Sequence, residues 1–360
     1  MRQTAYLLLA LGMIVPFAVA AQQTKLLTAD KHNEYGLVYS LPVTELRIDV
    51  TATRTVRKAG PYWQYAKKFI GTDNVVREDE ESWTVDKMEV TSYGVADPES
   101  RYLMQLKPGA TTYLAVADDG MLLAVNAEPT DNAVRKPSAP RKSPAKAFTG
   151  KEYLQYVGED FLASQSSAKQ AQLLAESLME IRDAKVSLTR GTAESMPTDG
   201  RQLELMLASL SDQEAALTAA FAGTETISSE TRTFTFRPEK EGRSVLFRLS
   251  DFEGFTTPGD YSGAPVYIQI SDVTEAELPK DVNGEEKKLP KDAVAYIIPG
   301  SAKITLSVPG RQLFSDRFDL AQFGAVFGLS PSLFTSKKEP SYAIFDPATG
   351  ALREIGEVRQ

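Results

Sequence analysis

The sequence predicts an α+β protein in which two mainly antiparallel β domains, the second of them sandwich-like, are joined through an antiparallel helical hairpin. Two patterns indicate this class: apolar and polar residues alternate before residue 129 and after residue 223, whereas apolar residues recur every three or four positions in the helical stretch between them. The length of 360 residues is a third indication, because about 150 residues per domain favours two or three domains. With 42% hydrophobic and 24% charged residues, the composition excludes wholesale disorder and a polytopic membrane protein.

Residues 1–20 have the pattern of a secretory signal peptide. Arg2 precedes an apolar run over residues 6–15, and small residues follow at Ala18 and Ala20. The run is shorter than the roughly 20 residues that a spanning helix needs, and no charged stop-transfer segment follows it, which disfavours an N-terminal anchor. We therefore expect an exported protein, periplasmic or secreted, with no membrane span after signal cleavage. Because the chain has no Cys, no lipoprotein anchor is expected.

Residues 34–128 predict an N-terminal β domain with one short helix. In residues 46–53 apolar and polar side chains alternate strictly, which places the apolar ones on one face of a strand. The sequence Asp-Asp-Gly at 118–120 separates two apolar runs and predicts a tight hairpin turn. The segment 60–71 begins with Gly-Pro, has apolar residues at helical spacing and ends in Gly, which favours a short helix.

Residues 129–148 form a basic, Pro-rich stretch in which no large apolar residue occurs between Val134 and Lys146, which predicts an exposed linker or long loop. Residues 149–223 then predict the helical hairpin, with a Pro-containing connection at 191–197. Both arms carry apolar stripes, and we expect them to be buried against the partner helix and a sheet, with Leu210 near the centre of the second arm. The hairpin is thus interpreted as a structural support between the β regions rather than a mobile lid.

Residues 224–360 predict the C-terminal β domain. Short β-branched and aromatic runs are separated by Gly, Pro and Asp, a spacing that suits a sandwich. The last two runs flank Asp-Pro-Ala-Thr-Gly at 346–350, whose residue types suit a five-residue reversal. Residues 280–291, rich in Lys, Glu and Asp, predict an exposed loop of this domain.

The residue inventory excludes several kinds of chemistry. A net charge of −8 without a basic patch in a folded segment argues against nucleic acid as a partner. The absence of Cys excludes disulfides and thiolate sites, and the single histidine, His32, precedes the first strand, a poor position for a triad or a catalytic metal. Phosphate-binding and dinucleotide glycine motifs are missing from the sequence. We expect no cofactor, no metal and no enzymatic activity; a carboxylate pair, as in glycoside hydrolysis, is the remaining catalytic alternative.

Two charged residues interrupt apolar patterns and are candidates for a site. Arg54 continues the apolar face of residues 46–52, where its guanidinium would contact an anionic ligand. The favoured alternative is that Arg54 ends the buried part of the strand or pairs internally with an acid. Glu214 interrupts the stripe of the second helix and is expected to face residues 169–174 of the first. For Glu214 a structural ion pair or an exposed stripe edge is favoured over a general acid.

The two tryptophans are candidate ligand-binding residues. Trp63, with Tyr62 and Tyr65, would make an aromatic platform for a sugar ring, but packing into the core is the favoured interpretation. Trp83 begins a strand and has the same two interpretations.

Seven segments spread over nearly the whole mature chain carry a resemblance: GLVYSLP at 36–42, ATRT at 52–55, the Gly-Pro and Tyr-Ala of 60–66, PTDG at 197–200, QEAAL at 213–217, QFG at 322–324 and FDPATGAL at 345–352. Together they resemble a family of exported proteins of Gram-negative anaerobes that is known only as a domain of unknown function. That resemblance implies no activity, cofactor or catalytic residue.

Two main functional hypotheses follow. The first is a non-catalytic cell-envelope interaction or assembly module whose partner is an unknown envelope protein. The second is a glycan-binding or carboxylate-dependent glycan-cleaving protein, for which saturable glycan binding lost in Trp63→Ala would be the sign. A third, weaker hypothesis is a scaffold that touches membrane or anionic glycan through the cations of the linker.

Overall fold

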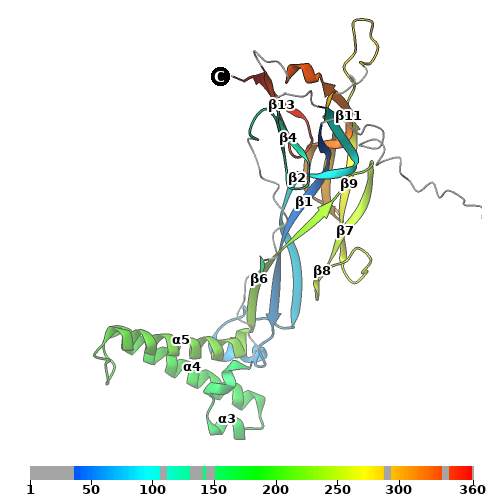
Figure 1. Cartoon of the computed structure of the whole chain (residues 1–360). Coiled ribbons are helices and arrows are strands. Elements are labelled where there is room, and N and C mark those ends of the chain that lie inside the picture. Colours follow the sequence, from blue (N-terminus) through cyan, green and yellow to red (C-terminus); the bar gives the residue numbers. More distant parts are fainter. Residues whose placement is uncertain are drawn as a thin grey trace, which may run out of the picture.

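The computed structural model describes residues 36–105, 112–129, 141–142, 151–287, 293–334 and 340–358. The predicted signal peptide, His32 and most of the predicted linker lie outside these residues. Figure 1 shows an elongated molecule: strands form a long body, the helices gather at one end of it, and the C-terminus lies at the other. The predicted α+β class with antiparallel sheets is confirmed.

The first sheet is built around one long strand. It runs in the order β2 (Glu80–Gln105), β1 (Gly36–Lys58), β6 (Thr224–Phe236) and β5 (Arg141–Lys142). All pairs in this sheet are antiparallel. The apolar residues of the predicted 46–53 alternation are fully buried, so the alternation correctly gave the inner face of β1.

The second sheet packs face to face with the first. Its order is β11 (Arg311–Leu329), β10 (Val294–Val308), β9 (Ala264–Thr274), β7 (Gly242–Ser250) and β8 (Gly254–Thr256). The core between the layers contains Leu46 and Ile48 of β1 together with Phe247 and Ile304 of the second sheet. The sandwich therefore combines strands of both predicted β regions, an exchange that the sequence did not predict.

A third sheet closes the end of the body that lies away from the helices. Its order is β13 (Leu352–Glu357), β12 (Ser341–Phe345), β4 (Leu122–Val125) and β3 (Leu114–Val116), and the short 3-10 helix η4 (Pro331–Leu333) precedes β12. Tyr39 lies in the core below it, where its hydroxyl accepts a 2.6 Å hydrogen bond from the backbone N–H of Ala295. Burial raises the pKa of Tyr39, which keeps the phenol protonated in the core.

The helical end contains two long helices and several short ones. They are η2 (Trp63–Tyr65), α2 (Ala66–Ile70), η3 (Glu152–Tyr156), α3 (Glu159–Ala163), α4 (Ser167–Arg190) and α5 (Gly200–Ala222). The predicted short helix within 60–71 is confirmed, and it ends at Gly71 in the left-handed conformation. The predicted hairpin of α4 and α5 is also confirmed. No helix in the described part of the chain is long and apolar enough to cross a membrane.

A tight crossing fixes the base of the hairpin to the end of β1. The backbone N–H of Tyr62 donates a 2.9 Å hydrogen bond to the carbonyl of Ala220. Just before it, a Cβ on Gly60 would lie 2.5 Å from that carbonyl oxygen, so only glycine allows the two backbones to meet. Leu217 and Phe221 of α5 are fully buried in the adjoining core.

The rest of the hairpin corrects one expectation. The buried side chains of α4 and α5 cluster near the β body, apart from Leu188, and Leu210 is only half-buried. The core around the hairpin base is made by helices and the segments next to them, without a strand residue among its described members. The expectation that a sheet covers the stripes was therefore wrong, because the outer half of the hairpin extends past the end of the body (Figure 1).

Candidate functional site

Arg54 sits where the buried part of β1 ends. Its side chain is half-exposed, and Nε lies 2.6 Å from Oε1 of Glu81 on β2. This is the internal ion pair that the sequence analysis gave as the alternative to a ligand contact.

Glu214 of α5 is held by two cations of α4. Arg182 Nε lies 2.9 Å from its Oε1 and Lys185 Nζ lies 2.7 Å from its Oε2. The hydrogen bond from Lys185, and then that from Arg182, lowers the pKa of Glu214. The ion pair was predicted but the partner region 169–174 was wrong, because the two helices are staggered and Glu214 lies opposite residues 182–185.

Trp63 does not form the three-ring platform, which was the less favoured of its two interpretations. Its ring is half-buried, and the guanidinium carbon of Arg77 lies 5.8 Å from the ring centroid. The two neighbouring tyrosines point into the hairpin base instead: the hydroxyl of Tyr62 donates to Gln170, and that of Tyr65 lies 3.1 Å from Ser167 Oγ.

Trp83 packs between the two layers of the sandwich. Its ring meets Phe255 edge-on, with centroids 6.3 Å apart. Gly254 has a φ of +72°, and a Cβ there would lie 2.8 Å from the indole ring. Within the described residues the indole Nε1 is buried without a hydrogen-bond partner. These contacts place Trp83 in the core packing rather than on an exposed binding surface.

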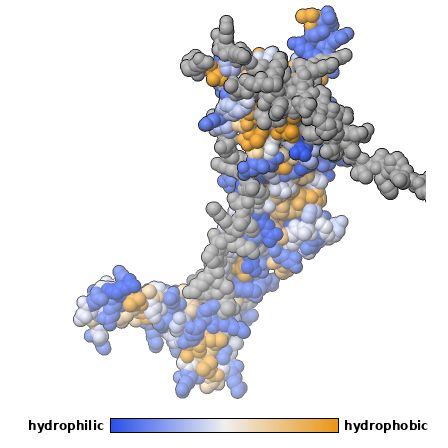
Figure 2. Space-filling model, viewed as in Figure 1, coloured by the Kyte–Doolittle hydropathy of each residue, from blue (hydrophilic) through white to orange (hydrophobic). Residues whose placement is uncertain are grey.

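The outer half of the hairpin, residues 179–213, is named here the distal arm. A groove of about 600 Å³ between its helices is lined by Leu188, Met206 and Leu210 together with Ser, Thr and Gln side chains. Large apolar side chains are also exposed on the distal arm, namely Met179, Val186, Met196, Leu205 and Met206, and of these Met206 lines the groove. Figure 2 shows apolar residues at the surface of the hairpin. The sequence analysis missed this surface because it assigned both stripes to the interior.

The second candidate site lies where β2, β11 and the turn at 346–350 meet. This junction pocket has a volume of about 430 Å³ and is lined by Ser92, Tyr93 and Gly94 of β2, Pro299 of β10, Arg317, Phe318 and Asp319 of β11, and Asp346, Pro347, Ala348, Thr349, Ala351 and Arg353 around the turn. One of the segments that carry the family resemblance, 345–352, supplies part of this lining, and Pro42 of another, 36–42, lies close to Gly350 of the turn.

A buried polar network fixes the junction. Thr44 Oγ1 donates a 2.8 Å hydrogen bond to the carbonyl of Ala348 and accepts one from the N–H of Ala321. Gln322 bonds the backbone of Thr44 through both ends of its amide and also donates to the carbonyl of Pro238. Because Thr44 is fully buried, losing a partner here would leave a buried polar group unsatisfied.

The turn itself is held by Asp346. One carboxylate oxygen accepts from the N–H groups of Ala348 and Thr349, at 2.8 and 2.9 Å, and the other accepts from Arg353. Gly94 lets the turn approach β2, since a Cβ there would lie 2.0 Å from the carbonyl oxygen of Pro347. With both oxygens engaged, Asp346 fixes the turn and is a poor candidate for one of two catalytic carboxylates.

Tyr93, at the rim of the junction pocket, is part of a separate network. Its hydroxyl donates a 2.7 Å hydrogen bond to Glu45, and Arg237 also binds that carboxylate. Burial, and next the bond to Glu45, raises the pKa of Tyr93 to about 12. Burial alone would raise the pKa of Glu45, but the bonds from Tyr93 and Arg237 outweigh it and lower that pKa.

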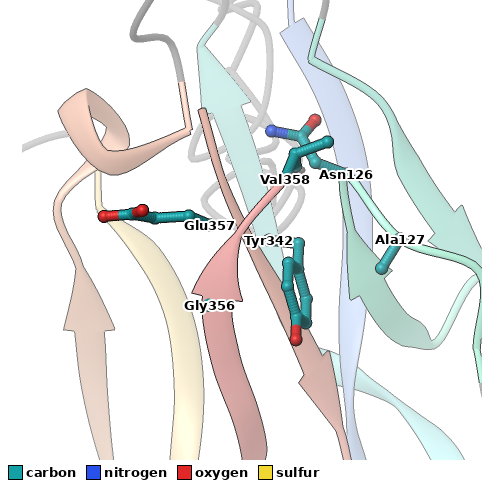
Figure 3. Close-up of a pocket in the computed structure, with 6 residues that line it drawn as sticks. All are labelled: Asn126, Ala127, Tyr342, Gly356, Glu357 and Val358. Atoms are coloured by element: carbon teal, nitrogen blue, oxygen red, sulfur yellow. The ribbon is translucent and has the colours of Figure 1, made fainter. Parts of the chain in front are cut away.

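A third hollow lies at the C-terminal end of the body (Figure 3). It has a volume of about 800 Å³ and is lined by Asn126, Ala127, Tyr342, Gly356, Glu357 and Val358. The Tyr342 ring lies against Gly356 and its hydroxyl donates to Glu354, while the carboxylate of Glu357 points away from Tyr342. Asn126 donates to the carbonyls of Phe334 and Ser341. These polar groups are used in joining strand ends, which makes this hollow the weaker candidate.

The described residues bring no three His, Asp or Glu side chains together as a metal site. Fold and sites together define an elongated α+β protein with a helical arm and a polar junction pocket. The family model described as "Domain of unknown function (DUF4831)" matches residues 35–353. The chain therefore belongs to this family, whose description gives no function. Searches of curated proteins and of solved structures found no match.

Proposed function

We propose that the protein is an exported, non-catalytic interaction or assembly module of the cell envelope, and that its distal arm is the part that binds a partner protein. The observation that carries this proposal is the contrast along the hairpin: the base is anchored in a core, while the outer half has exposed apolar side chains and a groove between its helices. Contiguous apolar surface marks protein interaction sites, and the groove brings together apolar side chains of both helices, namely Leu188, Met206 and Leu210.

The anchored base makes the distal arm a preorganised element. Ala171, Leu174 and Leu178 of α4 pack on Leu217 and Phe221 of α5, and Tyr62 fills the space beside them. A rigid base lowers the entropy lost when the outer half binds a partner. The arm is thus suited to present a fixed surface.

The groove between two antiparallel helices fits a third helix. An amphipathic helix would place apolar residues against Leu188, Met206 and Leu210, as in helix-in-groove recognition and in helix bundles. Charge favours a basic one. Among the described residues, Arg190 is the only cation of the distal arm that makes no ion pair. Five acidic residues of the arm make none, namely Glu180, Asp183, Glu194, Asp199 and Asp212. The occupant we propose is a basic amphipathic helix of an envelope protein.

A photo-crosslinker at position 205, introduced in the producing cells, tests this. Leu205 is 59% exposed on the distal arm, and Leu162, 67% exposed on α3 outside the arm, is the matched control. We expect a discrete adduct from position 205 with an envelope protein that carries a basic amphipathic helix, and none from position 162. With the purified pair, Leu205→Lys should weaken binding by about tenfold or more, because it removes an apolar contact and repels a basic helix, and Leu162→Lys should not. Equal adducts from both positions, or an adduct with a second copy of the chain, would overturn the proposed occupant.

Export is tested separately by the intact mass of the protein recovered from the periplasm or medium. The expected chain begins at Ala21 or Gln22. A chain that retains residues 1–20 contradicts export by signal cleavage.

One observation favours glycan binding as a second candidate function. Tyr261, in the loop between β8 and β9, is 85% exposed, and the guanidinium carbon of Arg248 lies 4.5 Å from its ring centroid. Arg248 is itself fixed by bonds to the carbonyls of Pro258 and Gly263, at 2.9 and 3.0 Å. One face of the ring is thus held and the other is open for stacking on a sugar ring. Trp63, the residue named from the sequence, is less exposed.

A titration with soluble oligosaccharides tests this alternative. Saturable binding that is lost in Tyr261→Ala and kept in Trp63→Ala would support it. Binding that is unchanged in Tyr261→Ala would remove the alternative.

A further inference from the structure

We infer that the junction pocket binds a small zwitterion of the α-amino acid type, with the ligand carboxylate on Arg317 and the ligand ammonium on Asp319. This inference goes beyond the proposed function, because the pocket lies in the β body and not on the distal arm.

Arg317 lines the pocket with an exposed side chain whose guanidinium is only partly used. Its Nη1 donates to Ser301 Oγ at 2.7 Å and, more weakly, to Thr274 Oγ1 at 3.4 Å. Both partners are neutral hydroxyls, and no ion pair to Arg317 is formed by any residue that the structure describes. The Nε and Nη2 groups together form the fork that binds a carboxylate in bidentate fashion. The two bonds to Nη1 hold the guanidinium while leaving that fork available.

The neighbouring strand strengthens the positive charge at this point. Lys303 on β10 is directly opposite Arg317 in the ladder, and like charges in opposed positions repel. A bound carboxylate would relieve this repulsion. Arg353, the other cation of the pocket, is paired with Asp346 at 2.7 Å and adds no unpaired charge.

Asp319 disfavours a ligand that carries only a negative charge. Residues 317 and 319 are two apart on β11, so their side chains leave the same face of the strand, and both line the junction pocket. Asp319 makes no ion pair with the described residues. One unpaired cation and one unpaired anion in the same pocket complement a ligand that carries both charges, whereas Asp319 would repel a carboxylate alone.

The opposite wall of the pocket is rigid. The turn at 346–350 is held by Asp346, by the close approach at Gly94 and by the Thr44–Gln322 network. A volume of about 430 Å³ is in the lower part of the range for small-molecule pockets. The pocket therefore has room for a small polar ligand without rearrangement of its wall.

Isothermal titration of the purified full chain with alanine, propionate and ethylamine tests the inference, since the last two probes each lack one of the two charges. We expect saturable binding of alanine, at least about tenfold tighter than that of either analogue. Arg317→Met should abolish alanine binding. Asp319→Asn should weaken alanine binding about tenfold and strengthen propionate binding, a reversal that a merely structural role would not give.

Arg311→Met is the matched control, because Arg311 lies on the same strand outside the pocket, and it should leave all three titrations unchanged. Thermal melts show that each variant is folded. Absence of saturable alanine binding overturns the inference, as does equal binding of alanine and propionate to the unaltered protein. Comparison of D- and L-alanine then shows which configuration the pocket accepts.

Discussion

The two halves of the helical hairpin have similar sequence patterns and opposite surroundings. Near the β body, α4 and α5 bury Leu174, Leu178, Leu217 and Phe221, whereas in the distal arm comparable apolar residues such as Leu205 are exposed. Helical spacing of apolar residues therefore indicates a helix and the face that prefers to be covered. It does not indicate whether the chain itself provides the cover. Substitutions along the hairpin test this difference, because the loss of stability should be large at the base and small in the distal arm.

The largest effect is expected at the base. Phe221→Ala should destabilise the protein by about 3–5 kcal/mol, because it opens a cavity in the core that anchors the hairpin. Chemical denaturation followed by circular dichroism measures it. A loss below about 1 kcal/mol would show that the base is loosely packed and would remove the contrast between the two halves.

Leu210 lines the groove of the distal arm. The stability loss on Leu210→Ala should lie between that of a core residue at the base and that of an exposed residue. The sequence analysis expected Leu210 to be fully buried, in which case Leu210→Ala would cost about 2–5 kcal/mol. Since the side chain is half-buried, we now expect about 1–2 kcal/mol, from the smaller apolar area removed from contact. The same denaturation experiment distinguishes the two values. A loss of about 2–5 kcal/mol in the free energy of unfolding would mean that the groove is covered in solution.

Glu214→Gln should cost about 0.5–1 kcal/mol, because the ion pairs to Arg182 and Lys185 are partly exposed. The effect depends on pH. The pKa of Glu214 is lowered from 4.5 in the folded state, so its stabilisation is fully present above about pH 4.5 and is lost as the pH falls through the folded-state value. Denaturation of both proteins at pH 7 and near pH 3 checks this, and a difference that grows on acidification would contradict it.

The smallest effect on stability is expected at Leu205, which is exposed on the distal arm. Leu205→Ala should change stability by less than about 0.5 kcal/mol, as is usual for surface sites, while it should reduce partner binding if the distal arm is the docking element. Measuring stability and cross-linking on the same variant separates the two roles. A stability loss of several kcal/mol would place Leu205 in a core and contradict the exposed arm.

Local pattern could predict the elements but not their partners. The alternation in residues 46–53 gave the buried face of β1, and the reversal at 346–350 was found from its Asp, Pro and Gly. The pairing of β1 with β6, far apart in the sequence, leaves no local signal, because any strand with the same alternation would fit. For the same reason the sequence analysis did not see that one sandwich takes strands from both regions.

For the candidate sites too, the sequence predicted local features but not the residues that the fold brings together. The ion pairs of Arg54 and Glu214 were predicted as alternatives, since a charge in an apolar pattern needs a partner, but the identity of each partner depends on strand register and helix stagger. Arg317 and Asp319 look like ordinary polar positions of an alternating strand. Only the fold shows that they line the same pocket as the turn at 346–350.

The direct continuation of α5 into β6 has a mechanical consequence. Gly223, with a φ of +79°, is the sole residue between them, and it packs against the end of β1. From Leu46–Phe236 to Lys58–Thr224, β6 is hydrogen-bonded antiparallel to β1, and such bonds run perpendicular to the strands. Tension applied to the arm along the body would therefore load this whole ladder in shear, with its bonds sharing the force instead of opening one after another. The hairpin is thus joined to the body through the full length of the β1–β6 pairing.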